Sequence, residues 1–254
     1  MHVAGQNRRL EKVDLARELE QIEGWLYLEE AWALHEAVQD FPDEGRPLTV
    51  VEIGSWKGRS TVALASAIRA RGDGKVFAID PHTGTSDGPE PGPVSTASEF
   101  LANVRAAGLQ PFVELIQTTA HEARLGFASR SVDVLFVDGS HHYDDVKTDI
   151  LDWQTALRDH STVAFNDPSV PGVYEALREL VVLYGSCFKR PALIQNTLFF
   201  NFRRNQSWTR HDTIALARLR FALALRFQAN RVRPYLPKWL VWVGHRVSRG
   251  LVGR

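Results

Sequence analysis

The chain has 254 residues, which is enough for one large α/β domain with an appendage. Its hydrophobic content of 44% and charged content of 24% are ordinary for a soluble globular protein, and its one cysteine, Cys187, excludes an internal disulfide. Residues 1–20 lack the apolar core of a signal peptide, and no stretch reaches the roughly 18 apolar residues of a membrane span. We therefore expect a cytoplasmic protein.

The formal net charge of zero conceals an uneven distribution. Residues 203–254 contain twelve Lys or Arg and one acidic residue, Asp212, so this segment carries +11 and the rest of the chain −11. The C-terminal fifth therefore presents a different kind of surface from the remainder.

Apolar spacing predicts two N-terminal helices and then an alternation of strands and helices. The first helices are expected over residues 10–22 and 28–40, before the breaker FPDEGRP. Strands are expected at 48–54, 75–80, 112–117, 132–138, 162–167 and 196–202, and helices at about 60–72, 97–108, 143–157 and 170–185. A proline- and glycine-rich stretch at 82–98 predicts a long loop of the kind that borders binding sites.

This alternation predicts an open, mostly parallel sheet with helices on both faces. We expect an N-terminal helical segment over 1–45, a core over 46–204 and a basic helical extension over 205–254. Ligands of such sheets bind beyond the carboxyl ends of the strands. The chemistry is therefore expected in the turn after Glu52 and just after the three strand-ending aspartates, which are Asp80, Asp138 and Asp167.

The turn V-E-I-G-S-W-K-G-R-S follows the first strand and is the first candidate binding element. Its glycines, Gly54 and Gly58, allow unusual backbone angles and a close approach of ligand or helix. Asp80 ends the next strand, 28 residues after Glu52, where a carboxylate can accept hydrogen bonds from ribose hydroxyls. Neither a phosphate loop nor a G-x-G-x-x-G pattern is present, which favours a nucleoside cofactor without a pyrophosphate, S-adenosylmethionine, over a plain tight turn.

Four motifs in order, E-x-G-S-W-x-G-x-S, A-I-D-P, F-V-D-G-S-H-H-Y and N-D-P, resemble class I S-adenosylmethionine-dependent methyltransferases. The chain is most similar to the bacterial small-molecule and sugar O-methyltransferases related to the cation-dependent catechol-type enzymes, over roughly residues 22–202. The resemblance implies a Rossmann-like fold with a mostly parallel seven-stranded sheet. It also implies a set of cofactor-binding residues: Glu52, Gly54, Ser55, Trp56, Gly58, Ser60, Asp80, Ala120, His121 and Asp138.

Asp138 and Asp167 end strands that we expect to be neighbours, so their carboxylates can converge. A divalent cation would remove their mutual repulsion, and Mg²⁺ takes one or two carboxylates together with water and substrate oxygens. In the catechol-type enzymes these two strand ends hold the metal, and there an asparagine follows the second aspartate. Here Pro168 follows instead, which leaves the third ligand open to His141 or His142.

Methyl transfer to a hydroxyl requires a base that removes the proton. His141 falls where the catechol-type enzymes place a catalytic lysine, and a histidine titrates near neutral pH. We predict His141 as the base, with His142 as the second candidate for this role, and Asp138 as a further catalytic residue. The alternative for both histidines is a helix cap or a solvated side chain.

Four residues are candidates for contact with the acceptor: Trp25, His82, His141 and Tyr143. Trp25 can stack on the apolar face of a sugar, although packing of the N-terminal helices explains it as well. A loop histidine without a role is the alternative for His82.

The basic segment after residue 204 has apolar residues at helical spacing. We expect it to pack on the acidic core or on a second subunit, as a homodimer, with peripheral membrane contact as an alternative. Nucleic acid is not expected, because no exposed aromatic platform accompanies the arginines.

The main hypothesis is an S-adenosylmethionine-dependent O-methyltransferase with a small hydroxylated acceptor, a saccharide or glycoside, assisted by Mg²⁺. One alternative is a metal-independent enzyme acting on a phenolic or polyketide product. Another is a cofactor-binding scaffold without activity.

Overall fold

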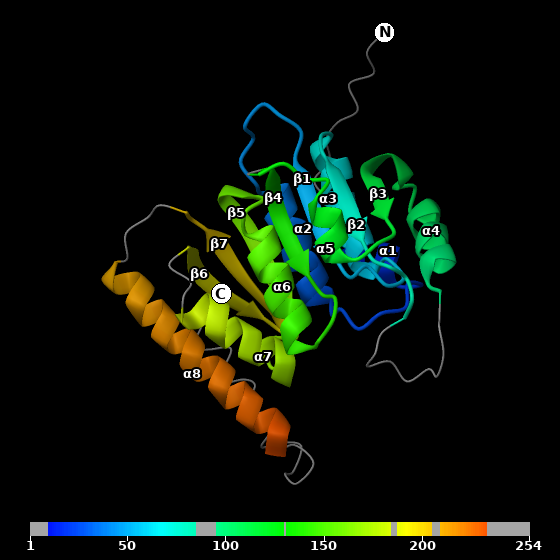
Figure 1. Cartoon of the computed structure of the whole chain (residues 1–254). Coiled ribbons are helices and arrows are strands. Elements are labelled where there is room, and N and C mark those ends of the chain that lie inside the picture. Colours follow the sequence, from blue (N-terminus) through cyan, green and yellow to red (C-terminus); the bar gives the residue numbers. More distant parts are fainter. Residues whose placement is uncertain (1–9, 85–94, 130, 184–186, 205–208, 233–254) are drawn as a thin grey trace. The chain divides into compact units, whose positions relative to one another are not determined.

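The computed structural model describes residues 10–84, 95–129, 131–183, 187–204 and 209–232. Most of the expected loop and the second half of the basic segment, residues 233–254, lie outside these ranges. The chain divides into two compact units, residues 1–123 and 124–254 (Figure 1). The expected division at residues 45 and 204 stays a prediction.

The first unit contains three parallel strands in the order β3-β2-β1. Its elements are α1 (Lys12–Leu19), α2 (Leu28–Gln39), β1 (Thr49–Ile53), α3 (Arg59–Arg71), β2 (Lys75–Ile79), α4 (Ala97–Ala106), the 3₁₀ turn η1 (Gln110–Phe112), β3 (Val113–Ile116) and α5 (Ala120–Arg124), whose last residue belongs to the second unit. The helix α3 packs on α1, α2 and β2. It is buried continuously from Ser60 to Ile68, as expected for a central helix.

Glycines set both ends of α3. Gly58 precedes the helix with φ 88° and Gly72 follows it with φ 87°, so both adopt the left-handed conformation. The N–H of Gly72 donates to the carbonyl of Ile68, as in a helix C-terminal cap. The helix therefore begins at the end of the glycine turn that follows β1.

The second unit contains four strands in the order β4-β5-β7-β6. Strands β4 and β5 are parallel, and β7 is antiparallel to both of its neighbours, β5 and β6. Its elements are β4 (Val132–Val137), α6 (Tyr143–Trp153), β5 (Leu157–Asn166), α7 (Pro171–Leu177), the π-helical η2 (Arg178–Leu183), β6 (Phe188–Ile194), β7 (Thr197–Phe202) and α8 (Arg210–Val232). All six residues of β4 are buried, as in a strand covered on both faces.

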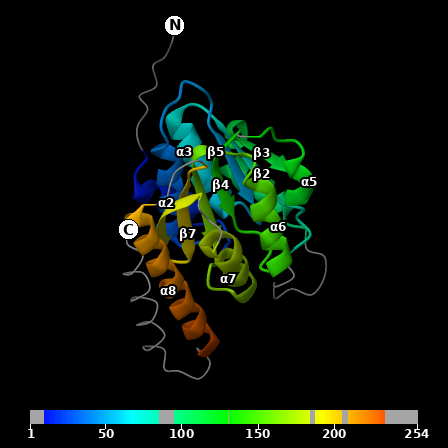
Figure 2. The same ribbon diagram turned by 60° about the vertical axis from the view of Figure 1, so that its left-hand side comes forward.

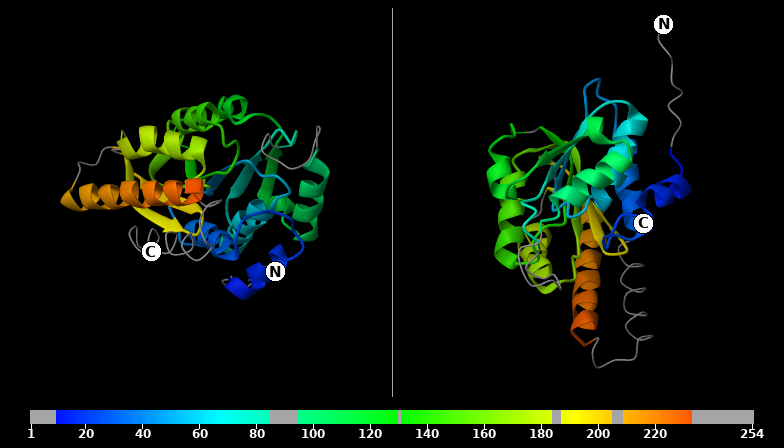
Figure 3. Two further views of the ribbon diagram at one scale, coloured as in Figure 1. Left: turned by 90° about the horizontal axis from the view of Figure 1, so that it is seen from below. Right: turned by 90° about the vertical axis from the view of Figure 1, so that its right-hand side faces the viewer.

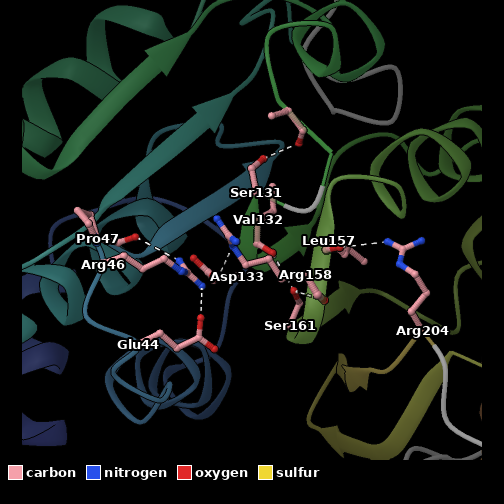
Figure 4. Close-up of polar contacts among 11 residues, drawn as sticks. Glu44, Arg46, Pro47, Ser131, Val132, Asp133, Leu157, Arg158, Ser161 and Arg204 are labelled. Carbon is pink, nitrogen blue, oxygen red and sulfur yellow. Dashed lines mark hydrogen bonds and ion pairs between the residues drawn. The ribbon is translucent and has the colours of Figure 1, made fainter.

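Polar contacts hold the ends of β4 and β5 that lie away from the expected site (Figure 4). Arg158 Nε lies 3.2 Å from Oδ1 of Asp133, which is fully buried. The hydroxyl of Ser161 donates to the carbonyl of Val132 at 2.7 Å. A guanidinium nitrogen of Arg204 donates to the carbonyl of Leu157 at 3.1 Å. These contacts stabilise the strand pair from which the site residues project.

Two predicted boundaries in this unit were wrong. The helix expected to reach residue 157 ends at Trp153, and β5 begins at Leu157, five residues before the predicted start. The register between β4 and β5 shifts between Val132 and Val134, and His160 has φ 71°, so a bulge interrupts the apolar alternation there. The strand β6 was not predicted, because Lys189 and Arg190 interrupt its apolar pattern.

The helix α8 is the described part of the basic extension. It contacts α7, η2 and β6 (Figures 2 and 3). Leu219, Ala222 and Leu223 are buried, which agrees with packing on the core of this unit. No helix in the described ranges combines the length and apolar character that crossing a membrane requires.

Candidate active site

The turn after β1 has three residues in the left-handed conformation: Gly54 (φ 83°), Trp56 (φ 46°) and Gly58 (φ 88°). A Cβ at Gly58 would also meet the ring of Phe100 at 3.1 Å, so glycine is required there. Trp56 adopts this conformation although it is bulky, which costs free energy and needs support from its surroundings.

Asp80 supplies that support from the end of β2. Its Oδ2 accepts the backbone N–H groups of Ser55 at 2.9 Å and Trp56 at 2.8 Å, and its Oδ1 accepts the N–H of His82 at 2.7 Å. The carboxylate therefore orders both the glycine turn and the segment after β2, a role that sequence reasoning missed. Its side chain remains 16% exposed, so part of it is still accessible to a ligand.

Buried polar atoms without a hydrogen-bond partner gather around this turn. Among the described residues none bonds to Ser55 Oγ, Trp56 Nε1, His82 Nε2 or Glu52 Oε1. Buried polar groups are almost always satisfied in native proteins. The three that belong to the end of β1 and to the turn, on Glu52, Ser55 and Trp56, therefore fit a polar ligand with several donors and acceptors, as the methionine and ribose parts of S-adenosylmethionine offer.

Glu52 is fully buried at the end of β1. Burial raises the pKa of its carboxyl group to about 7, and the hydroxyls of Ser60 and Thr61 oppose this rise. The Thr61 hydroxyl donates to Oε2. Because the carboxyl group titrates near neutral pH, a positive charge brought beside it would favour its ionised form.

His82 is not placed to face an acceptor, because its side chain is completely buried. Its Nδ1 lies 2.8 Å from the hydroxyl of Thr96, and its ring packs against Phe100. Burial lowers the pKa of His82, and Asp80 opposes the shift. Its position therefore supports a structural role beside Asp80.

Trp25 is 66% exposed, and its ring lies 5.6 Å from that of Trp56 in a tilted arrangement. An exposed indole that touches the glycine turn is available to a ring-shaped ligand. Ala120 and His121 begin α5, and His121 is exposed. Their contact with adenine stays a prediction.

In the second unit the register of β4 and β5 decides which side chains meet. Val137 pairs with Phe165, so Asp138 lies opposite Asn166 and not opposite Asp167. The Nδ2 of Asn166 donates to Asp138 Oδ1 at 3.1 Å. A hollow of about 10 Å³, the space that one water molecule needs, is lined by residues that include Asp138, His141 and Asn166.

Asp167 follows β5 with φ 50° and faces a different set of partners. Its Oδ1 accepts a hydrogen bond of 2.6 Å from Asn196 Nδ2, and its Oδ2 lies 3.5 Å from His141 Nε2. Burial raises the pKa of Asp167, and the charges of His141 and Arg226 and the bond from Asn196 lower it. The arrangement is a histidine with a carboxylate behind one ring nitrogen, as in general bases oriented by an acid.

His142 and Tyr143 differ from His141 in their surroundings. His142 is the exposed N-cap residue of α6. The Tyr143 hydroxyl donates to Glu179, and Lys147 Nζ lies 3.0 Å from both this hydroxyl and Glu179 Oε1. These two hydrogen bonds raise the pKa of Lys147. Tyr143 is therefore part of a surface network.

The expected magnesium ligands do not form a converging set. Asp138 and Asp167 each bond to a different asparagine, and His142 lies on the surface. In the described ranges no group of three or more His, Cys, Asp or Glu side chains is arranged to hold a metal. Binding of Mg²⁺ by both carboxylates would require their side chains to rearrange. In the described arrangement, Asp167 pairs with His141 and does not share a metal site with Asp138.

Comparisons with known proteins agree with this geometry. Residues 51–168 match the model of a methyltransferase domain family, Methyltransf_24. The uncharacterized protein y4gI of Sinorhizobium fredii is 34% identical over 146 residues, which cover 54% of this chain and 15% of that protein. The chain thus spans about a seventh of the length of this curated relative.

Solved structures of O-methyltransferases share the fold. The O-methyltransferase NovP aligns with a TM-score of 0.57 and 16% identity over 70% of this chain and 81% of its own. TomG from Streptomyces achromogenes aligns at 0.54 and 16% over 76% and 88%. A putative caffeoyl-CoA O-methyltransferase from Staphylococcus aureus aligns at 0.54 and 14% over 77% and 93%.

These alignments confirm the expected Rossmann-like fold with seven strands, most of them parallel within the two units. The glycine turn, Asp80, Asp138 and Asp167 all lie within the matched segment. Residues 51–168 are thus similar to a methyltransferase domain.

Proposed function

We propose that the protein is an S-adenosylmethionine-dependent O-methyltransferase that acts on a small hydroxylated acceptor. The observation that carries the proposal is the cluster of buried polar atoms without partners around the turn that Asp80 orders. The structure of TomG was determined in complex with SAM. Because this chain shares that fold, we propose the same cofactor for it. When bound, the cofactor supplies an electrophilic methyl group.

The cofactor residues have separate tasks in this proposal. The glycine turn and Ser55 approach the methionine part, Glu52 offers a carboxylate to its ammonium group, and Asp80 offers the remaining acceptor capacity of its carboxylate to the ribose. Ser60 and Thr61 hold Glu52 in place. Ala120 and His121 are proposed for the adenine.

His141 is the proposed base. Its Nε2 lies 3.5 Å from Asp167 Oδ2. In the neutral tautomer that has its proton at Nε2, facing this carboxylate, Nδ1 is the unprotonated nitrogen. That nitrogen would accept the proton of the acceptor hydroxyl. Asp167 orients the ring. Asp138, whose Oδ1 accepts a hydrogen bond from Asn166, lies three residues before His141 in the chain.

A saccharide or glycoside is the proposed acceptor class. The supporting feature is the exposed indole of Trp25, since an aromatic face can stack on the apolar face of a sugar ring. Phenolic and polyketide acceptors are the second class, because they would stack equally well.

Assistance by Mg²⁺ is a second version of the mechanism. It is favoured by two carboxylates at the ends of adjacent parallel strands, and it needs one of them to exchange its asparagine for the cation. A cation held there by Asp138 and Asp167 would supply Lewis acidity toward the acceptor hydroxyl.

Assembly and location stay proposals. Packing of α8 on its own unit supports the core-packing version of the basic extension. A homodimer and peripheral membrane contact are proposed on the uneven charge of the chain, and a cytoplasmic location on its single cysteine. Nucleic acid is not proposed as a partner.

The test is calorimetric titration of the full chain with S-adenosylhomocysteine, followed by transfer of radiolabelled methyl groups to panels of sugars and phenols. Micromolar binding and label in one panel would support the proposal. The absence of nucleoside binding would overturn it. Repeating the assays with EDTA and then with restored Mg²⁺ separates the two versions, since only the magnesium version predicts loss and recovery of turnover.

A further inference from the structure

Arg226 of α8 is buried although it is an arginine, with 2% of its surface exposed. It lies on the helix face formed by Leu219, Ala222 and Leu223, all of them buried at helical spacing. An arginine at that depth requires opposite charge or hydrogen-bond acceptors close by. The acceptors that surround its guanidinium group therefore indicate the role of this side chain.

Two contacts fix the position of α8 along its neighbours. The ring of Phe227, next to Arg226, stacks on Tyr174 of α7 with centroids 4.4 Å apart. In the first turn of α8, Asp212 pairs with the buried Lys189 of β6 at 3.4 Å. The helix is thus held near its start, at Asp212, and near Arg226, at Phe227. Packing of α8 on its own unit therefore sets how deeply Arg226 is buried and where its side chain points.

The guanidinium of Arg226 reaches the proposed base through two side chains. Its Nη1 lies 3.5 Å from Asn196 Oδ1, and Asn196 Nδ2 donates to Asp167 Oδ1 at 2.6 Å. The other oxygen of Asp167, Oδ2, lies 3.5 Å from His141 Nε2. With its oxygen toward Arg226, the Asn196 amide presents its nitrogen to Asp167, so the guanidinium selects the amide orientation that holds the carboxylate.

We propose that Arg226 is a positioning residue, which fixes the Asn196 amide and the Asp167 carboxylate and thereby the ring of His141. The inference rests on the proposed function only in taking His141 as the base. Arg226 lies outside residues 51–168, the segment that matches the methyltransferase domain. The basic extension thus contributes a side chain to the support of the candidate active site.

The test compares Arg226→Met with Arg226→Lys, and uses Arg220→Met, which alters an exposed arginine of the same helix, as the control. The full chain is labelled with ¹⁵N-histidine, and the ring signals of His141 are assigned with His141→Gln. Wild type and Arg220→Met should show one tautomer with a protected Nε2–H. Arg226→Met should show averaged ring signals and loss of the protected proton, and Arg226→Lys should recover part of the wild-type pattern.

An unchanged His141 spectrum in folded Arg226→Met would overturn the proposal. If Arg226→Met does not fold, Asn196→Leu removes the link without altering α8, and the same loss of the Nε2–H signal is expected. With an acceptor in hand, Arg226→Met should lower kcat by about 10²-fold with little change in KM, the size of effect that misplacement of a reacting group produces.

The two proposals fail in different ways. If Arg226→Met alters the His141 signals but the wild-type protein does not bind S-adenosylhomocysteine, the positioning role stands and the methyltransferase proposal is contradicted. If the protein binds the nucleoside and turns over but Arg226→Met leaves the His141 signals unaltered, the methyltransferase proposal stands and the positioning role is contradicted.

Discussion

The backbone N–H of Trp56 lies 2.8 Å from Asp80 Oδ2, so a carboxylate at the end of β2 holds a strained residue in the turn after β1. The same carboxylate accepts the N–H of Ser55 and, through its other oxygen, that of His82. The shape of the turn and the placement of the carboxylate are thus coupled. Loss of the charge should disturb both together.

Asp80→Asn should weaken the binding of S-adenosylhomocysteine by about 30-fold or more, or about 2 kcal/mol, because an amide cannot accept three N–H groups as a carboxylate does. Calorimetry measures the dissociation constant. Asp73→Asn, at a half-exposed position that pairs with Arg71, is the control and should bind as wild type does. Equal affinities in the two variants would contradict the role given to Asp80.

His141→Gln should lower methyl transfer by about 10²- to 10⁴-fold, the usual contribution of a general base, and leave nucleoside binding unchanged. His142→Gln should retain most activity, since His142 is an exposed N-cap residue. Label transfer to the best acceptor of the panels measures both variants. Greater loss in His142→Gln would move the base to the neighbouring histidine.

Sequence patterns placed Asp80, Asp138 and Asp167 at the ends of strands, because strand ends can be read from apolar runs that stop. The partners of these aspartates could not be read. Asn166 meets Asp138 only because the strand register offsets Asp167 by one residue, and register depends on the bulge near His160. That bulge has no sequence signal strong enough to predict it.

Arg226 was also beyond prediction. In the sequence it is one of twelve basic residues of a segment, and charge patterning assigns all of them to a surface. Its burial follows from the tertiary packing of α8 on Tyr174 and its neighbours. The N-D-P motif indicated that the end of β5 was chemically important. However, Arg226, which contacts Asp167 through Asn196, lies about sixty residues further along the chain.

The buried carboxyl group of Glu52 should make the stability of the protein depend on pH. Its pKa rises from 4.5 in the unfolded chain to about 7 in the folded one, mainly because of burial. Between these values the folded chain holds a proton that the unfolded chain has released. The stabilising contribution is therefore complete below pH 4.5 and is lost as the pH rises through about 7, by roughly 3 kcal/mol in total.

Glu52→Gln should lack this loss. Relative to wild type, its free energy of unfolding should increase by up to roughly 3 kcal/mol between about pH 4.5 and about pH 8. Urea unfolding of the ligand-free proteins at the two pH values measures the difference. Glu114→Gln, at an exposed position, is the control and should run parallel to wild type. Parallel curves for Glu52→Gln would show that the carboxyl group does not titrate as described.

Gly172→Ala should destabilise the protein, because α7 begins in close contact with the segment that carries His141. A Cβ at Gly172 would collide with the carbonyl oxygen of His141 and lie 2.8 Å from the backbone nitrogen of Tyr143. Both neighbours are backbone atoms, so either the segment or the helix must move. Overpacking of this kind costs about 1–3 kcal/mol, and movement of His141 should lower turnover further.

Urea unfolding and label transfer on the same preparation separate these two effects. Glu175→Ala, which places the same residue type on the exposed face of α7, is the matched control and should change neither quantity appreciably. Activity in folded Gly172→Ala should fall more than the unfolded fraction explains, because the backbone that positions His141 is displaced. Full activity per folded molecule would mean that the segment yields without moving the base, and that its backbone position is not critical for catalysis.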